Sequence, residues 1–462
     1  MIERFVALCL RRRFIVWAVF FLVAVYGVVS FARLPMEAYP DIADVSAQVI
    51  TQVNGLAAEE VEQQITIPLE QGLMGTPGVS VMRSKSTFGL SLITLVFKDG
   101  VEDYWCRQRI QERIAGISLP YGATPGLDPL TSAVGEIYRY TLESPTRSLR
   151  ELSELQRWTV IPRLKQLSGI ADVSNFGGLT TQYQLELDPA RLTAFNLSLQ
   201  RITDAINANN ANAGGSILNH GEQGFVIRGI GLIRNLDDMG NIVVAQKNGT
   251  PVLLKDLGTL HLGHQERHGV LGKDQSDDSI EGIVLMLKGE NPSRVLAEVH
   301  RTVDLLNAKV LPKDVRLVPY LDRTTLVDAT VHTVSRTLIE GIVLVVVVLL
   351  LFLGSPRTAI TVALTIPMAL LTAFIFMHHL HIPANLLSLG AIDFGIVVDG
   401  AVVVVENLLR RREESQGRPL TLQEAYTSTA QVARPVFFAT IIIITAYLPL
   451  FSFERVEYKL FS

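Results

Sequence analysis

Long apolar runs near both ends of the chain enclose a longer region in which polar and apolar residues are mixed. The first run, residues 14–31, carries no charge and directly follows Arg11, Arg12 and Arg13. Apolar stretches of about 18 residues or more are typical of helices that cross a bilayer. A cleaved signal peptide is the alternative, but no small-x-small cleavage site follows the run. The pattern therefore favours an uncleaved first transmembrane helix.

Four further apolar segments follow the mixed region and are predicted to cross the membrane. The linkers between them differ in charge: one carries Arg357, and another carries five arginines between residues 410 and 434. The intervening linker, residues 378–384, has no Lys or Arg. Under the positive-inside rule this alternation places the N-terminus in the cytoplasm. The predicted segments are residues 337–353, 359–377, 385–409 and 436–453.

The mixed region, residues 34–336, reads as short strands and amphipathic helices of an α+β domain outside the membrane. It contains a weak internal repeat. Ile67 and Ile161 are each followed by proline, and each precedes a glycine that opens a strand, at Gly78 and Gly169. The repeat predicts two βαβ units of the ferredoxin-like kind. The predicted fold class is a polytopic α-helical membrane protein with a large α+β region.

An insertion interrupts the second of these units at residues 182–270. It is predicted to hold a strand, a helix and then a loop rich in Asn and Gly at residues 209–215. Such loops favour turns and surface contacts rather than core positions. The insertion is therefore expected to form a separate subdomain with a flexible arm.

Composition removes several classes of function. Hydrophobic residues make up 48% of the chain and charged residues 19%, which fits a membrane protein, and the net charge of −4 gives no basic surface for nucleic acid. Cys9 and Cys106 are the two cysteines, too few for a disulfide framework or a thiolate metal cluster. There is no GxxxxGK[ST] loop for ATP and no nucleophile with an evident base.

Three acidic residues lie inside the fourth predicted span: Asp393, Asp399 and Glu406. Carboxylates at this depth are costly, so they indicate ion or proton movement. On an α-helix Asp399 and Glu406 lie about 20° apart around the axis and about 10 Å apart along it, with Asp393 about 120° from Asp399. Burial favours the protonated form of a carboxylate, which suits a proton relay. Asp399 is the first candidate; a structural role in hydrogen bonding between helices is the alternative.

Other residues are candidates for packing or for metal binding. Gly395 and Gly400 are expected to permit close helix packing in the membrane. Imidazole binds zinc well, and three histidines cluster in the predicted outer linker, although interfacial polarity is the alternative. They are His378, His379 and His381.

Two carboxylates beside the strands of the second unit, Glu136 and Asp172, offer oxygen ligands for a transiently bound cation. Solvated carboxylates are common at strand ends, so a plain surface role is the alternative for both.

Four motifs point to a known family. The longest, Asp-Phe-Gly-Ile-Val-Val-Asp-Gly-Ala, begins at Asp393. The others are Leu34-Pro35 with Pro40-Asp41, Gly135-Glu136-Ile137-Tyr138, and Asp322-Arg323-Thr324. With them the whole chain resembles the resistance–nodulation–division (RND) efflux transporters. The drug-exporting branch has two adjacent aspartates in this span, whereas the separated aspartates here are similar to those of the heavy-metal efflux branch, in its form that carries divalent cations.

The resemblance implies a function and a set of partners. It implies a secondary active transporter rather than an enzyme: a permease of the bacterial inner membrane that exchanges protons for Zn²⁺, Co²⁺, Cd²⁺ or Ni²⁺ without a cofactor. It implies a homotrimer in contact with lipid, a periplasmic membrane-fusion adaptor and an outer-membrane channel. Family members are about twice as long, so the chain is expected to be an N-terminal half that ends after the fifth span, and the C-terminal half becomes a further partner. A drug or organic-solute RND exporter and a non-transporting gene fragment are the alternatives.

The resemblance also assigns domains along the chain. Residues 1–33 would form the cytoplasmic N-terminus and first transmembrane helix. The periplasmic region would comprise two porter subdomains and a docking insert. Their expected limits are residues 34–133 for the first porter subdomain, 134–181 with 271–330 for the second, and 182–270 for the insert.

Overall fold

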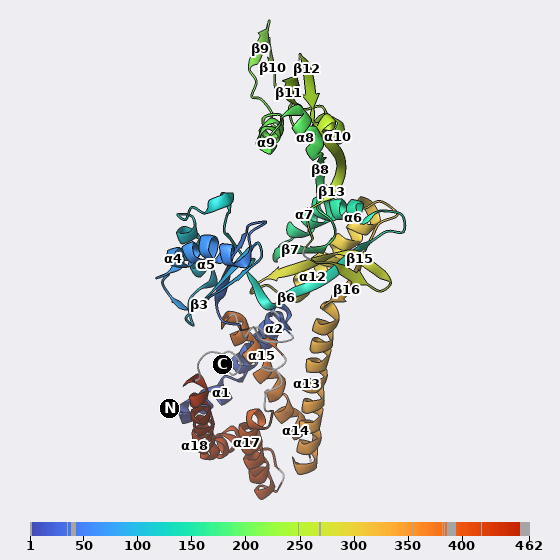
Figure 1. Cartoon of the computed structure of the whole chain (residues 1–462). Helices are drawn as coiled ribbons and strands as arrows, with labels where there is room; N and C mark the ends of the chain where they lie inside the picture. Colours follow the sequence, from blue (N-terminus) through green and yellow to red (C-terminus); the bar gives the residue numbers. More distant parts are fainter. Residues whose placement is uncertain are drawn as a thin grey trace.

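Three regions follow one another along the long axis of the molecule (Figure 1). Helices fill one end, two sheet-containing lobes lie side by side in the middle, and a smaller lobe extends at the other end. This architecture comes from a computed structural model. It describes residues 2–34, 36–37, 43–247, 249–267, 269–353, 355–380, 382, 384–385, 394–416 and 418–452.

The first lobe is a four-stranded antiparallel sheet covered on one face by helices. The strand order is β3-β4-β2-β5. Alternate side chains of the central strands, such as Val49 and Ile93, pack against Ile65, Leu69 and Ile110 of the helical layer. The elements are β2 (Ser46–Gln52), α3 (Ala58–Val61), α4 (Ile67–Leu73), β3 (Val79–Thr87), β4 (Leu90–Phe97), α5 (Asp103–Ile114) and β5 (Gly126–Leu127).

The second lobe repeats this arrangement with longer strands. Its strands follow the order β16-β6-β15-β7, all antiparallel, and the short β14 pairs with β15. Tyr138, Tyr140 and Val284 face the helices and are almost fully buried with Leu164 and Val299. The elements are β6 (Thr131–Glu143), α6 (Leu149–Leu155), α7 (Ile161–Lys165), β7 (Ile170–Gly177), β14 (Leu271–Lys273), β15 (Ser276–Leu287), α12 (Pro292–Leu305) and β16 (Arg316–Asp322).

The sequence repeat corresponds to a repeated break in the helices. A π-helical turn precedes Ile67 and Ile161, at η1 (Glu62–Thr66) and η3 (Gln156–Val160). The proline that follows each isoleucine has no N–H and would clash with the carbonyl four residues earlier in a regular α-helix. Widening the turn to a bond across five residues relieves that clash.

The insertion forms the outermost lobe. Strands β8 (Thr181–Leu187) and β13 (Gly258–His264) pair antiparallel and connect it to the second lobe. The predicted loop at residues 209–215 leads into a two-stranded hairpin, β9 (Ile217–His220) and β10 (Gln223–Val226), whose residues are all exposed. The other elements are α8 (Pro189–Phe195), α9 (Leu199–Ala208), α10 (Leu236–Gly240), β11 (Val243–Lys247), β12 (Thr250–Leu253) and α11 (Leu254–Leu257).

Seven helices form the opposite end of the described chain. Three helical segments are long and apolar enough to cross a membrane: 13–33, 358–380 and 422–447. A shorter apolar segment, 339–352, lies within α13. The helices are α1 (Ile2–Arg11), α2 (Arg13–Arg33), α13 (Thr324–Leu353), α14 (Pro356–Ala363), α15 (Thr365–Leu380), α17 (Phe394–Glu414) and α18 (Leu422–Tyr447).

Several helices extend beyond the apolar segments that predicted them. Helix α13 begins at Thr324 rather than at residue 337, because Asp322 Oδ1 accepts a hydrogen bond from the Thr324 backbone N–H (2.9 Å) and so caps the helix. Helix α18 likewise begins at Leu422, capped by the Thr421 side chain. Helix boundaries follow capping groups as well as hydropathy.

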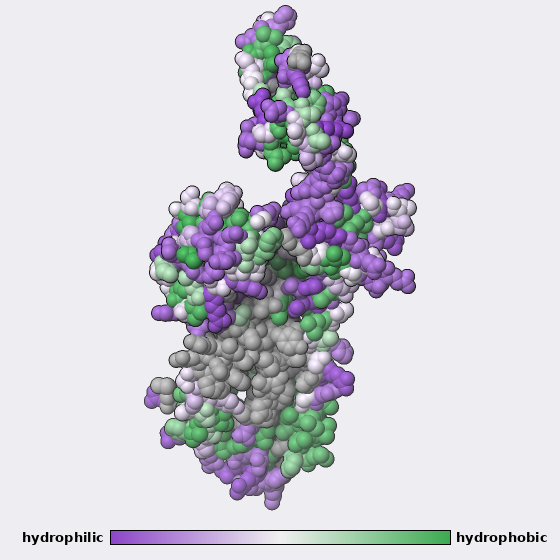
Figure 2. Space-filling model, in the orientation of Figure 1, coloured by the Kyte–Doolittle hydropathy of each residue, from purple (hydrophilic) through white to green (hydrophobic). Residues whose placement is uncertain are grey.

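Surface hydropathy separates the same regions (Figure 2). Hydrophilic residues dominate the sheet lobes, whereas the helical end shows hydrophobic patches on both sides and hydrophilic residues at its tip. The described surface therefore has the division expected of a membrane-embedded helical part and a water-exposed part.

Candidate functional site

Helix α17 (Phe394–Glu414) carries two of the three acids that the sequence singled out. Asp399 and Glu406 are both exposed on this helix, and Asp393 lies outside the described residues. Because they are seven positions apart on an α-helix, the two carboxylates stand about 10 Å apart along the axis and on nearly the same side. Within the described chain, neither carboxylate forms an ion pair with a Lys, Arg or His.

The side of α17 that does make contacts faces other helices of this chain. Ala401, Val402 and Val405 pack against the apolar cluster formed with α13, α14 and α15. A Cβ added to Gly400 would lie 3.1 Å from Val436 Cγ1 of α18, so the glycine lets the two helices approach closely. Gly395 belongs to the first turn of the same helix.

Side-chain hydrogen bonds fix α17 to α18 about two turns beyond the contact of Gly400. The side-chain amide of Asn407 donates to the backbone oxygen of Ser428 (2.7 Å) and to its hydroxyl (2.9 Å), and that hydroxyl donates back to the Asn407 carbonyl (3.2 Å). Ser428 is almost fully buried. Buried polar groups that satisfy one another hold a helix pair in a single register.

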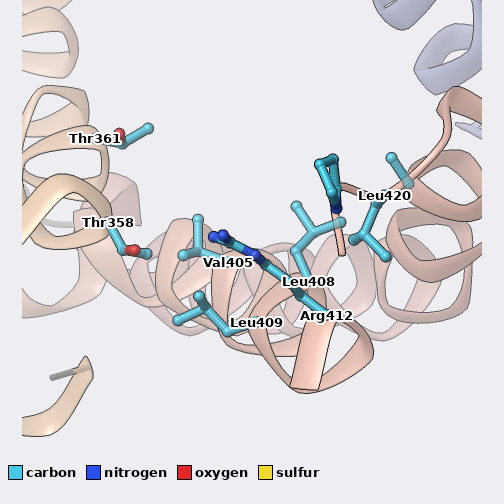
Figure 3. A pocket seen from close by; sticks show the side chains of 9 residues that line it. Thr358, Thr361, Val405, Leu408, Leu409, Arg412 and Leu420 are labelled. Carbon is cyan, nitrogen blue, oxygen red and sulfur yellow. The ribbon is translucent and has the colours of Figure 1, made fainter. Parts of the chain in front are cut away.

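A pocket of about 530 Å³ lies between α14, α17 and the segment before α18 (Figure 3). Its wall is mostly apolar, and the side chain of Arg412 extends across it in the direction of Thr358. None of the lining residues is Asp, Glu, His or Cys. This pocket therefore offers no ligand that a divalent cation prefers.

The predicted histidine cluster is only partly in a linker. His378 and His379 belong to the last turn of α15 (Thr365–Leu380), which runs further than predicted, and His381 lies outside the described residues. Neighbouring helical residues point about 100° apart. His379 Nε2 is 2.8 Å from the hydroxyl of Tyr26 on α2, so this imidazole joins two helices.

Glu136 and Asp172 lie on the same face of the second sheet. Both pair with Leu285 of β15, Glu136 from β6 on one side and Asp172 from β7 on the other. Residues opposite each other in a sheet share a face, and strands two apart are separated by about 10 Å. This face is the one turned away from the helices that bury Tyr138 and Val284. The two candidate carboxylates thus flank a single apolar side chain.

Each of these carboxylates already has a basic partner. Arg139 donates from Nε to Glu136 Oε2 (3.0 Å), with a second bond from Nη2 to the same oxygen. Lys165 Nζ is 2.6 Å from Asp172 Oδ1. Hydrogen bonding to Glu136 is the main reason that the pKa of Arg139 is raised above its usual range. Glu136 and Asp172 are therefore each paired with a basic side chain of the described chain.

A third carboxylate on the same face was not among the sequence candidates. The side chain of Glu281 is only 3% exposed, and its Oε1 lies 3.4 Å from Nη1 of Arg139. The hydroxyl of Tyr320 also donates to this oxygen, and desolvation together with Glu281 raises the pKa of Tyr320. A charged residue inside the apolar run of β15 was the available signal for it.

Among the described residues, no group of three or more His, Cys, Asp or Glu side chains is close enough to hold a metal ion. The open face of the second sheet supplies two separated carboxylates and a buried third one.

Comparison with known proteins identifies the family. The model of the AcrB/AcrD/AcrF family matches residues 5–462. The chain belongs to this family. AcrB/AcrD/AcrF proteins are RND transporter permeases rather than enzymes, so the predicted family and the predicted absence of an enzymatic reaction are confirmed.

Among curated members of the AcrB/AcrD/AcrF family, the chain is similar to proteins of metal efflux. It is 38% identical over 480 residues to the cation efflux system protein CzcA of Alcaligenes sp. (strain CT14). The identity is 38% to the cobalt-zinc-cadmium resistance protein CzcA of Cupriavidus metallidurans and 33% to the cation efflux system protein CusA of Escherichia coli K12. Each match covers 100% of this chain and 45% or 46% of the relative. The chain thus spans about half the length of these relatives.

A solved structure agrees with this assignment. The crystal structure of a heavy metal efflux pump, in its crystal form I, aligns with a TM-score of 0.91 at 66% identity. The alignment covers 99% of this chain and 45% of the other. The RND permease fold is therefore shared over the whole chain.

Proposed function

We propose that this chain supplies the N-terminal half of a proton-driven exporter of divalent heavy-metal cations in a bacterial inner membrane. The observation that carries the proposal is the pair of carboxylates, Asp399 and Glu406, on one side of the largely apolar part of α17, residues 394–409. The similarity to a cobalt-zinc-cadmium resistance protein supports Zn²⁺, Co²⁺, Cd²⁺ or Ni²⁺ as the cargo.

The proposed proton path runs along α17. Asp399 takes up a proton from the outer side, and Glu406 passes it toward the end of the helix that carries Arg410, Arg411 and Arg412. A carboxylate in a membrane is stable when protonated or paired, so each proton transfer alters which helices it can contact. Asp393 would extend the path outward, and Gly395 and Gly400 would let neighbouring helices follow closely.

The proposed cation path runs over the second sheet. Glu136 and Asp172 would be early oxygen ligands, completed by water or by groups of a longer protein. In this interpretation the two lobes with strand orders β3-β4-β2-β5 and β16-β6-β15-β7 are ferredoxin-like porter subdomains. The outer lobe is then the docking insert, which would meet a periplasmic adaptor and an outer-membrane channel.

The proposal is tested by metal tolerance. The chain, expressed within a protein of the relatives' full length, should raise zinc or cobalt tolerance in a bacterial host that lacks its own exporters. Asp399→Asn should return tolerance to the level of the empty vector, because an amide cannot exchange the proton. Glu413→Gln removes an exposed acid from the last turn of the same helix and is the matched control. Full tolerance in Asp399→Asn, or no added tolerance from the unmodified protein, would contradict the proposed function.

A further inference from the structure

Three carboxylates and one guanidinium share the open face of the second sheet because β6 contains an irregularity. Residues 136 and 139 are an odd number apart, so a regular strand would place them on opposite faces. The pairing with β15 skips Ile137: Tyr138 pairs with Val284, and Glu136 with Leu285. That bulge brings the Glu136 side chain round to the face of Arg139.

Arg139 contacts two carboxylates that differ sharply in exposure. Glu136 is 43% exposed and accepts from both Nε and Nη2, whereas Glu281 is 3% exposed and lies 3.4 Å from Nη1. A buried carboxylate that loses its positive partner is strongly destabilising. Glu281 therefore keeps the Arg139 guanidinium beside it even when Glu136 binds another group.

The exposed partner is the one that a cation could take. A divalent cation that binds Glu136 must displace the guanidinium, since both compete for the same carboxylate oxygens. The displaced guanidinium does not have to leave the sheet, because the 3.4 Å separation from Glu281 is longer than the 2.7–2.9 Å typical of a charge-assisted hydrogen bond. A short shift toward Glu281 would keep its charge neutralised.

We propose that Arg139 is a positioning residue that exchanges between Glu136 and Glu281 and so competes with the transported cation at Glu136. The inference rests on the proposed function, in which Glu136 is a cation ligand. The exchange keeps binding weak and reversible: the guanidinium moves onto Glu281 as the cation arrives and returns to Glu136 as the cation leaves. A transport site needs this reversibility, because a tightly held cation would not be released.

The exchange predicts opposite effects from two variants of the full chain. In Glu281→Gln the guanidinium loses its second carboxylate and binds Glu136 more firmly, so the Kd for Zn²⁺ should rise about tenfold. The double variant Arg139→Gln/Glu281→Gln lacks the guanidinium that competes with Zn²⁺, and it leaves no unpaired charge buried at this place. Its Kd for Zn²⁺ should therefore fall about tenfold. The measurement is Zn²⁺ titration of the purified chain in detergent against a fluorescent chelator.

Matched variants separate this inference from simpler effects. Glu143→Gln removes a carboxylate that lies on the same strand but is paired with Lys273, and it should leave the Kd unchanged. Shifts of the two Glu281 variants in the same direction, or no shift in either, would overturn the exchange. Glu136→Gln should abolish the Zn²⁺ binding that depends on this face. If it keeps the unmodified Kd, both the exchange and the cation path of the proposed function fail; if only the exchange fails, Glu136→Gln still loses binding.

Discussion

An ion pair between Arg147 and Asp314 joins two loops of the second lobe. Arg147, in the turn after β6, donates from Nε to Asp314 Oδ2 (2.7 Å), in the loop before β16. The hydroxyl of Thr146 donates to the same oxygen (3.1 Å). The Arg147 guanidinium is the largest cause that lowers the pKa of Asp314 to about 2. This pair joins two segments that are far apart in the sequence.

The ion pair predicts a pH dependence of stability. Because the pKa of Asp314 is lower in the folded chain than the usual value of 3.8, its contribution is complete above about pH 4 and is lost as the pH falls toward 2. Asp314→Asn should therefore lower Tm at pH 7, and the gap from the unmodified chain should close between pH 4 and pH 2. The measurement is thermal melting of both proteins across this range. A gap that is constant with pH would show that the carboxylate charge plays no part.

The side chains of the candidate cation site could be predicted only in part from the sequence. Glu136 and Asp172 stand at strand positions that the hydropathy pattern predicts, and register places them on one face. Arg139 could not be assigned to that face, because strand alternation without the bulge at Ile137 puts it on the other one. The burial of Glu281 could not be predicted from the sequence for a different reason. It depends on partners from β6 and β16, which are distant in sequence.

At the scale of elements, the two lobes use the same local devices with different surroundings. Gly78 and Gly169 open corresponding strands after the Ile-Pro helices, and both have positive φ, 81° and 85°. A Cβ at Gly78 would meet nothing closer than 3.5 Å. A Cβ at Gly169 would lie 2.6 Å from Val295 Cγ2, in the core beneath α12. A side chain in place of the glycine would therefore be tolerated less well in the second lobe than in the first.

This pair of glycines gives a matched prediction of stability. Gly78→Ala should cost about 1 kcal/mol, the strain of a left-handed backbone at a residue with a Cβ. Gly169→Ala should cost a further 1–3 kcal/mol or so, because the methyl group also overpacks the core. The measurement is thermal unfolding of each variant, followed by circular dichroism in detergent. Equal losses in the two variants would contradict the packing contribution.

Element boundaries show where hydropathy stops being informative. The apolar run at residues 337–353 predicts the membrane part of α13 but not its start at Thr324, which Asp322 fixes by capping. The basic segment before residue 14 was predicted only as an N-terminus, yet α1 (Ile2–Arg11) forms there and lies against α18. A local capping group decides the first outcome and a contact between distant segments decides the second, and hydropathy records neither.

At the scale of the whole molecule, the hairpin β9–β10 exposes every residue of both its strands. It stands at the tip of the outer lobe (Figure 1). Apolar side chains lie along both of its strands. Ile217 is 62% exposed, Phe225 51% and Val226 76%. Exposed apolar patches on an extended element mark contact surfaces. We therefore propose that the hairpin contacts a neighbouring copy in the homotrimer that the resemblance to the RND family implies.

The predicted consequence concerns self-association. Phe225→Asp should weaken the oligomer about tenfold or more, because a buried Phe contributes about 2 kcal/mol, and it should leave Tm unchanged. Gln223→Asp adds the same charge on the same strand without removing an apolar side chain, and it should have little effect. The measurement is analytical ultracentrifugation of both variants in detergent. Equal association of Phe225→Asp and the unmodified chain would remove the hairpin from the interface.

Helix α13 links the position of the second sheet to that of the apolar helices. Its 30 residues run without a break from the end of β16 to Leu353, a length of about 45 Å at 1.5 Å per residue. The first turn is fastened to the second lobe at Thr324, whose backbone N–H donates to Asp322 Oδ1 (2.9 Å) and whose hydroxyl lies 3.5 Å from Nε2 of His300 on α12. The helix is thus a continuous rod with one end at the sheet and the other among the apolar helices. If α13 tilts by about 5° about its end at Leu353, its other end, at the sheet, moves by about 4 Å. This displacement is larger than the distance from the Arg139 guanidinium to Glu136 (3.0 Å) or to Glu281 (3.4 Å).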